Sequence, residues 1–339
     1  MNAAESIVDD MIDGYVSAFE QVVRGHQDPR IVVRAKGRKD PDRKVTLLIG
    51  NGSGHEPIAM GFVGAGLLDA NVVGDVFAAP SADLILDGIR EVSGKAGCIL
   101  LISQHSGDMI NGRAAVMLAE EERLRVRALP MYDDISSAPR DRIQDRRGAP
   151  GTMFIYKILG AAAEAGMPLD DLMTLGRAVR ARTVTLAAAL SPGISPLTGQ
   201  PMFDLPDDEI YLGMGVHGEP GIGRTGVGPV RDLVTLIVDK LLGDYPIASG
   251  GQAAVIVNGM GGTTLMELLT VWNETRHALA ARGIAAVAPM IGSFVTTQEM
   301  GGFSISLLEP AGDMLRLWTA PSDTPFFPSI RHAEKEKSQ

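Results

Sequence analysis

Two histidines that lie far apart in the chain occupy similar glycine-framed turns. His55 lies in the run GNGSGHEP at residues 50–57, and His217 lies in GMGVHGEP at residues 213–220. Small residues beside an imidazole leave room for a ligand against backbone N–H groups, and Gly52, Ser53 and Gly54 could donate to its hydroxyl or carbonyl oxygens. One such histidine could simply cap a turn. Two of them, each following an apolar run, favour a ligand site built across two domains.

A third candidate segment is Ser103 to Asp108, which ends another apolar run and precedes a helical pattern. The carboxylate of Asp108 could cap that helix, a role worth about 1 kcal/mol. It could equally be a base that points into a cleft at the carboxyl end of a strand, where open α/β sheets bind their ligands. The residues alone leave both roles open.

Several residues have the chemistry of metal ligands, although their spacing matches no known ligand motif. They are His55, Glu56, His105, Asp108 and His217. Zinc sites usually show a recognisable spacing, such as two histidines separated by one helical turn. We therefore expect no metal site.

Nucleotide-binding motifs are weak in this sequence. The pattern G-x-G-x-x-G occurs at 213–218 and 221–226, but the first match continues into Glu-Pro instead of a helix, and the second follows a proline instead of a strand. Ser93-Gly94-Lys95 is followed by Ala96, so it does not complete a phosphate-binding loop. A dinucleotide-dependent dehydrogenase would rest on these glycines alone, and nicotinamide titration would test it. We expect no cofactor site in this chain.

The elements that must position these residues alternate between short apolar runs and helical patterns. In the first half, expected strands at 45–49, 98–103 and 126–131 alternate with expected helices at 82–92, 110–121, 152–165 and 170–182. After a segment rich in proline and glycine at 191–201, expected strands at 209–215, 253–257, 285–291 and 303–308 alternate with expected helices at 228–242 and 263–281.

This alternation predicts an α/β fold with two α/β domains, each a mixed, largely parallel sheet flanked by helices. The first lobe, 1–185, would carry His55 and Asp108. The second lobe, 186–330, would carry His217, and 331–339 would form a flexible tail.

Composition narrows the class of protein. A chain of 339 residues with 45% hydrophobic and 21% charged residues is long enough for two packed cores. Its net charge of -10 disfavours nucleic acid and anionic membranes as partners. The single cysteine, Cys98, lies in an apolar run and allows no intrachain disulfide. The sequence shows no apolar stretch long enough to cross a bilayer and no basic, apolar N-terminal leader. We therefore expect a soluble, cytoplasmic protein.

The sequence resembles the substrate-binding K domain of dihydroxyacetone kinases from about residue 45 to the C-terminus. The matching segments follow one another in order along the chain. They are 50–57, 64–66, 77–80, 107–108, 145–152, 215–221, 258–267, 292–294 and 302–304, and residues 8–15 fit as well.

The resemblance implies that His217 forms a covalent hemiaminal with the carbonyl carbon of a short ketose. His55 and Asp108 would assist proton transfers, and Gly52, Ser53, Gly54 and Ser103 complete the predicted binding set. A covalent bond to the carbonyl would distinguish a ketone from an alcohol, which the small apolar area of a triose cannot. Neutral imidazole, abundant near its ordinary pKa of about 6.5, would be the nucleophile.

The resemblance also implies partners. The nucleotide, ATP or a bound ADP with Mg, would belong to a separate helical L subunit. A phosphotransferase-system protein would be the phosphoryl donor in the ADP case. A homodimer is typical of the family.

Three departures from the family pattern concern the substrate. Where relatives commonly carry Lys-Asn-Tyr-Thr, this chain has Ser-Gln-His-Ser at 103–106; Thr-Ser-Pro-Thr becomes Ala-Ala-Pro-Ser at 78–81; and position 51 is Asn instead of Gly. These changes favour a four-carbon or branched ketose, of erythrulose or apulose type, as an alternative to dihydroxyacetone. A non-catalytic K-like binding module that acts with transcription regulators is the second alternative.

Overall fold

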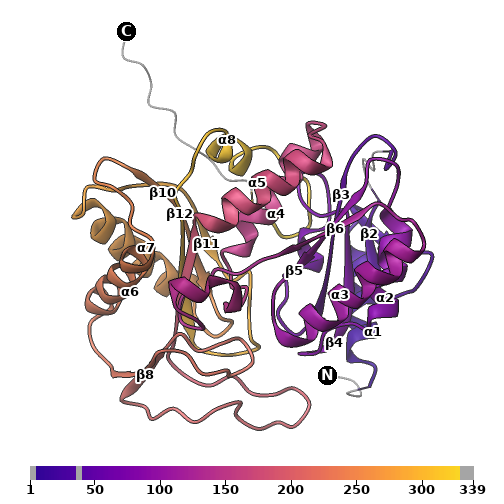
Figure 1. Cartoon of the computed structure of the whole chain (residues 1–339). Helices are drawn as coiled ribbons and strands as arrows, with labels where there is room; N and C mark the ends of the chain where they lie inside the picture. The colour runs from indigo at the N-terminus through magenta and orange to yellow at the C-terminus, as the bar shows by residue number, and fades with distance from the viewer. Residues whose placement is uncertain (1–4, 36–39, 329–339) are drawn as a thin grey trace.

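The computed structural model describes residues 5–35 and 40–328 of the chain. Within these residues two six-stranded sheets are arranged side by side, each with its own helices (Figure 1). The predicted flexible tail at 331–339 lies outside the described residues.

The first sheet has the strand order β1-β2-β4-β3-β5-β6. Strands β4, β3, β5 and β6 are parallel, whereas β2 pairs antiparallel with both β1 and β4. The parallel strands are rich in apolar residues because helices cover both faces of the sheet. The bounds are β1 Val22–Arg24, β2 Ile31–Arg34, β3 Thr46–Ser53, β4 Ala70–Val76, β5 Cys98–Ile102 and β6 Val126–Pro130.

The second sheet has the order β11-β10-β12-β7-β8-β9. Its bounds are β7 Thr183–Ala189, β8 Glu209–Leu212, β9 Gly223–Gly226, β10 Gln252–Gly259, β11 Ala285–Gly292 and β12 Gly302–Leu308. Only β10 and β11 pair in parallel, and the remaining neighbours are antiparallel.

The α/β class with two mixed sheets is therefore confirmed, but the expectation of a largely parallel sheet is wrong for the second lobe. Parallel neighbours need a long crossover, usually a helix, between consecutive strands. In the second lobe α7 joins β10 to β11, which are neighbours in the sheet, whereas α6 joins β9 to β10, which are not neighbours. The steps from β7 to β8, β8 to β9 and β11 to β12 contain no helix, so these strands return in the opposite direction.

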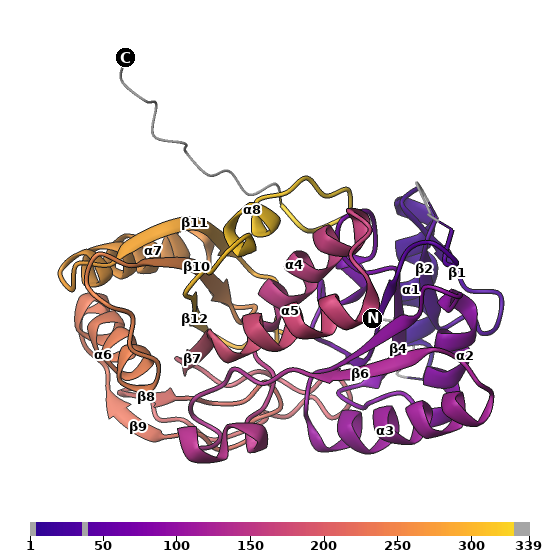
Figure 2. The same cartoon turned by 45° about the horizontal axis from the view of Figure 1, so that its top comes forward.

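The helices form three layers around the two sheets. Their bounds are α1 Ile7–Ala18, α2 Ala82–Val92, α3 Ser106–Glu121, α4 Thr152–Glu164, α5 Leu169–Ala181, α6 Val230–Asp244, α7 Leu265–Ala280 and α8 Met314–Trp318, with short 3-10 helices at Met60–Phe62 and Arg140–Asp145. Leu47 and Ile49 of β3 face the core that contains α4 and α5, whereas Leu48 faces α2 and α3. In the second sheet Ile256 faces the shared core, and its neighbours Val255 and Val257 face α6 and α7. Helices α4, α5 and α8 thus lie between the sheets (Figure 2).

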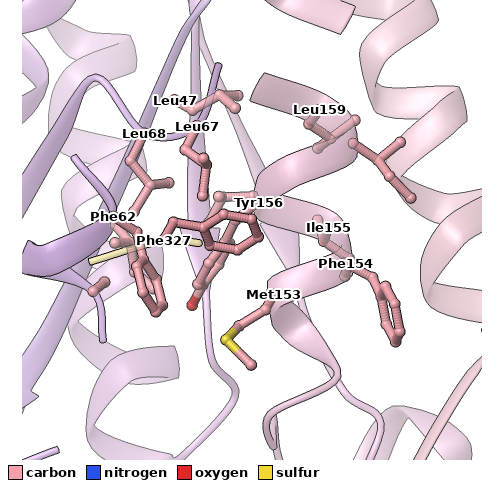
Figure 3. Packing of buried hydrophobic residues seen from close by; sticks show 14 of the residues in the cluster. Leu47, Phe62, Leu67, Leu68, Met153, Phe154, Ile155, Tyr156, Leu159 and Phe327 are labelled. Atoms are coloured by element: carbon pink, nitrogen blue, oxygen red, sulfur yellow. The ribbon is translucent and has the colours of Figure 1, made fainter. Parts of the chain in front are cut away.

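Helix α4 is the centre of this shared layer. Every residue from Thr152 to Ala163 is buried. Figure 3 shows its apolar side chains beside Phe62, Leu67 and Leu68 of the first lobe and Phe327 from the C-terminal segment. A helix that is apolar on all sides is expected only where it is enclosed by other elements.

The C-terminal segment returns to the first lobe after α8. Asp323 forms a β-bridge with Ala65, and the Phe326 N–H donates to the Gly61 carbonyl at 3.0 Å. Strand β7, which begins at Thr183, already belongs to the second sheet. Because the lobes share a core and exchange segments, the division at residues 185 and 186 stays a prediction. Across the described ranges, the helices are too short or too polar to cross a membrane.

Candidate active site

A cavity of about 610 Å³ lies between the lobes, at the carboxyl ends of β3 and β5. This is the edge at which parallel α/β sheets bind their ligands. Its size is typical of a small-molecule site. The cavity is lined by five of the predicted residues, Gly52, His55, Ser103, Asp108 and His217. The structure thus brings together residues that the sequence places in separate lobes.

His55 follows β3 and is held against a loop of the second lobe. Its Nδ1 lies 2.8 Å from the carbonyl oxygen of Thr296, and its own carbonyl accepts from the Thr296 N–H at 3.2 Å. A carbonyl only accepts hydrogen bonds, so Nδ1 carries the hydrogen and Nε2 keeps a lone pair. Burial, and then the charge of His217, lowers the pKa of His55 to about 3. His55 is therefore neutral at physiological pH.

His217 lies in the loop between β8 and β9 and is bound by a carboxylate instead of a carbonyl. Glu219 accepts from the His217 backbone N–H at 2.9 Å and from ring Nδ1 at 2.9 Å. A Cβ at Gly215 would lie 2.1 Å from Glu219 Oε2, so a side chain there would displace the carboxylate from this position. Although burial raises it, the hydrogen bond and charge of His217 bring the pKa of Glu219 well below its usual range. Glu219 is an anion that fixes the orientation of the His217 ring.

The two imidazoles face each other across the cavity, with His55 Nε2 only 2.9 Å from His217 Nε2. Because His55 Nε2 holds a lone pair, the proton between the rings belongs to His217. Loss of the Nε2 proton leaves a lone pair that points into the cavity, which is the requirement for a nucleophile.

Asp108 supplies a carboxylate to the same cavity. Helix α3 begins at Ser106 and its N-cap residue is His105, so Asp108 lies within the first turn and does not cap the helix. Asp108 Oδ2 accepts from the Ser103 hydroxyl at 2.5 Å and lies 3.6 Å from His105 Nδ1. The capping alternative is therefore wrong. Its position on the cavity wall is compatible with a general base.

Ser53 and Gly54 are predicted binding residues that lie outside the cavity lining as the described residues define it. The Gly54 N–H donates to the Glu56 carboxylate at 3.0 Å, so it is not available to a ligand. Gly54 has φ +97°, and a Cβ there would meet the ring of Phe77 at 2.5 Å. The Ser53 hydroxyl is buried and has no partner among the residues described.

Sequence reasoning did not assign a site role to four further residues that lie on the cavity wall: Phe77, His105, Arg147 and Glu219. The rings of His55 and His217 lie 5.0 and 5.7 Å from that of Phe77. Arg147 Nη1 lies 3.8 Å from Glu219 Oε2. Glu219 could have been found from its place two residues after His217. His105 lies in the candidate segment Ser103 to Asp108 but was considered only as a metal ligand, and Phe77 and Arg147 come from loops whose path the sequence does not indicate.

Neither G-x-G-x-x-G match has the surroundings of a dinucleotide site. Residues 213–218 form the turn that carries His217, and residues 221–226 lead into β9. A pyrophosphate site of this type needs a helix to follow the glycines. The structure therefore explains these glycines by the close folding of the His217 loop.

Comparison with known proteins identifies the family. The Dak1 domain model matches residues 13–326, so the chain belongs to the Dak1 domain family. It is 38% identical to the dihydroxyacetone-binding subunit DhaK of the PTS-dependent dihydroxyacetone kinase 1 of Listeria innocua, over 96% of this chain and 98% of that protein. The suspected resemblance to the K domain is confirmed.

Two further proteins show how widely the fold is used. A D-erythrulose kinase of Mycolicibacterium smegmatis is 35% identical over 96% of this chain, which covers 56% of that kinase. The solved structure of a dihydroxyacetone kinase operon co-activator, Dha-DhaQ, aligns with a TM-score of 0.87 at 29% identity, covering 93% of this chain and 97% of that chain. The family thus includes kinases and a protein named as a co-activator.

Proposed function

We propose that this chain is the substrate-binding subunit of a dihydroxyacetone-kinase-like enzyme and holds a short ketose as a covalent hemiaminal on His217. The observation that carries this proposal is the His217 ring itself. Its Nδ1 is bound to an anionic Glu219 and its Nε2 faces the cavity. The names of the relatives, dihydroxyacetone-binding subunit and erythrulose kinase, support the same class of substrate.

The covalent step uses the lone pair of His217 Nε2. This pair forms a bond to the ketose carbonyl carbon, the C=O π electrons move to oxygen, and the oxygen becomes a hydroxyl by taking up the proton that left His217 Nε2, which His55 Nε2 passes on. The imidazole gains positive charge during attack, and Glu219 stabilises it through Nδ1–H. His55 Nε2, which is neutral, accepts a hydrogen bond from the new hydroxyl.

The phosphoryl step uses Asp108. With the ketose held on His217, the Asp108 carboxylate takes the proton of the terminal hydroxyl as that oxygen attacks phosphorus, and the donor nucleotide would leave as its diphosphate. The Ser103 hydroxyl, which donates to Oδ2 at 2.5 Å, keeps the carboxylate in place. Gly52 contributes to the wall against which the ligand oxygens lie.

The phosphoryl donor would come from another subunit. The D-erythrulose kinase is nearly twice as long as the matched segment, which leaves room for a second domain in that protein. For this chain we propose an L-type partner with ATP, or with ADP and Mg that a phosphotransferase-system protein rephosphorylates. The "PTS-dependent" name of the Listeria relative favours the second donor. We also propose that the subunit forms a homodimer.

The direct test of the nucleophile is His217→Ala. After incubation with dihydroxyacetone, intact-protein mass spectrometry under native conditions, without reduction, should show an adduct on the natural chain and none on the variant. The control is His277→Asn, which changes an exposed histidine on α7. An undiminished adduct on His217→Ala would show that another residue is the nucleophile.

Asp108→Asn tests the base. The adduct should persist, because His217 is untouched, whereas phosphorylation with an L-type partner should fall by roughly 100-fold or more. Unchanged turnover would contradict the assignment of Asp108.

A four-carbon or branched ketose is the second candidate substrate. Ala78, Ala79 and His105 line the cavity, so these departures from the family pattern lie on the wall that a ligand would contact. Turnover of erythrulose, apulose and dihydroxyacetone with the same partner would decide, and a strong preference for dihydroxyacetone would exclude this candidate.

The co-activator Dha-DhaQ makes a regulatory binding module a real alternative. Both functions could use a hemiaminal, so adduct formation does not separate them. Phosphorylation of any ketose by this chain with an L-type partner and a phosphoryl donor would exclude a purely regulatory role. Its absence across the three ketoses would favour that role.

A further inference from the structure

We propose that His105, His217 and Glu219 form a binding site for a divalent transition-metal cation, with Zn²⁺ as the best match. We further propose that the bound cation prevents ketose from adding to His217. The first half of this inference stands on its own, and the second half rests on the proposed function.

The donor atoms already converge. One donor atom from each of the three residues lies within 4.8 Å of the others. His217 Nδ1 is 2.9 Å and His105 Nε2 is 3.9 Å from the same atom, Glu219 Oε1. Ligands of a tetrahedral ion with bonds of about 2.1 Å are roughly 3.4 Å apart, so the two distances lie on either side of the required value. Small side-chain rotations would close the site.

The donor set selects the class of ion. Two imidazoles and one carboxylate are a common three-ligand set of zinc sites that keep a fourth position for water or a ligand. Mg²⁺ and Ca²⁺ prefer oxygen ligands, so they fit this set poorly. The fourth position would face the cavity that all three residues line.

Charged groups lie behind two of the ligands. His105 Nδ1, the ring nitrogen opposite its donor, lies 3.6 Å from Asp108 Oδ2. A carboxylate behind a histidine ligand is a common feature of metal sites, because it orients the ring and makes it a stronger donor. Arg147 lies 3.8 Å from the second oxygen of Glu219 and is itself fixed by Asp134 at 2.7 Å.

Metal binding and adduct formation exclude each other through the protons of His217. The nucleophile needs hydrogen on Nδ1, bound to Glu219, and a lone pair on Nε2. A cation on Nδ1 displaces that hydrogen, removes Glu219 from the ring and withdraws electron density from the imidazole. His217 would then be a metal ligand instead of a nucleophile.

His105 and His217 were among the possible ligands in the sequence, but their spacing predicted no metal site, because the ligands come from two loops in different lobes. His105 precedes α3, whereas His217 and Glu219 lie between β8 and β9. Spacing along the chain detects sites built on one helix or hairpin. It does not detect one assembled by the packing of two lobes.

The test titrates the purified, metal-free chain with Zn²⁺ by calorimetry and with Co²⁺ by visible absorption, in the absence of any ketose. We expect one ion per chain and, for Co²⁺, the intense bands of a four-coordinate ion. His105→Phe, which keeps a ring beside His217, should bind at least about tenfold more weakly, since it deletes a ligand. Glu219→Gln should show a similar loss.

His277→Asn is the matched control, because it removes an exposed imidazole far along the chain from these ligands, and its affinity should equal that of the natural chain. Circular dichroism of His105→Phe without metal verifies its folding, and His105→Asn replaces it if it does not fold. No binding by the natural chain, or equal binding by a folded His105 variant, overturns the proposal.

The second half is tested by measuring the dihydroxyacetone adduct with and without Zn²⁺ by native intact-protein mass spectrometry. The adduct should decrease in proportion to metal occupancy, and an adduct unaffected by saturating metal would overturn this half. If no adduct forms even without metal, the proposed function fails, while the metal titration still decides the metal site.

Discussion

The turns that carry His55 and His217 look alike in sequence but give their histidines opposite environments. In both turns the glutamate accepts from the backbone N–H two residues before it: Glu56 from Gly54, and Glu219 from His217. In the first turn, histidine lies one residue before the glutamate, and its ring bonds the carbonyl of Thr296 instead. In the second turn, the histidine lies two residues before the glutamate, and its ring also reaches the carboxylate.

A single glycine accounts for the difference. Gly218, with φ +83°, stands between His217 and Glu219, whereas His55 and Glu56 are adjacent. The two turns have equal length, and this exchange of glycine and histidine places the second histidine at the position whose N–H the carboxylate binds, so backbone and ring share one anion. One histidine thereby becomes a buried neutral acceptor and the other an imidazole supported by negative charge. The comparison teaches that the partner of Nδ1 sets the role of each ring.

Replacing each glutamate by glutamine, in two separate variants, is the strongest way to test this comparison. Glu219→Gln should slow adduct formation by roughly 1,000-fold, because an amide can donate to Nδ1 and hold His217 in the tautomer whose Nε2 has no lone pair. Glu56→Gln should change it less than about threefold, since that carboxylate binds only backbone in the described structure. The rate at which the dihydroxyacetone adduct forms on each variant is measured by native intact-protein mass spectrometry.

Equal losses in the two variants would contradict the assigned difference between the turns. Urea denaturation of each variant separates loss of structure from loss of chemistry.

Prediction from sequence succeeded where local pattern determines position. Strands β3 and β5 are apolar runs of a parallel sheet, so the residues after them, His55 and Asp108, were expected at one edge. The second sheet was less predictable, because its antiparallel order depends on which connections lack a helix. The contacts of His217 with His55 and of His105 with Glu219 depend on how the lobes pack through α4, and no local pattern encodes that.

The neutral ring of the first turn gives a smaller predicted effect. His55→Asn removes the accepting Nε2 that lies 2.9 Å from His217 Nε2. We expect adduct formation to slow by roughly tenfold, which corresponds to the loss of about one hydrogen bond. The same mass-spectrometric assay measures the rate of adduct formation. A decrease in this rate as large as that of Glu219→Gln would show that His55, not Glu219, controls the nucleophile.

The same variant should change how stability depends on pH. The pKa of His55 is lowered by burial to about 3, whereas unfolded histidine titrates near 6.5. Between these values the unfolded chain binds more protons, so the contribution of His55 to stability is present above pH 6.5 and is lost as pH falls toward 3. The slope is at most about 1.4 kcal/mol per pH unit.

Free energies of unfolding from urea titrations between pH 5 and 6.5 should therefore fall less steeply for His55→Asn than for the natural chain. His277→Asn, at an exposed site, should keep the natural slope. A slope unchanged in His55→Asn would mean that the buried ring is not held neutral, and the contrast between the two turns would then rest on Glu219 alone.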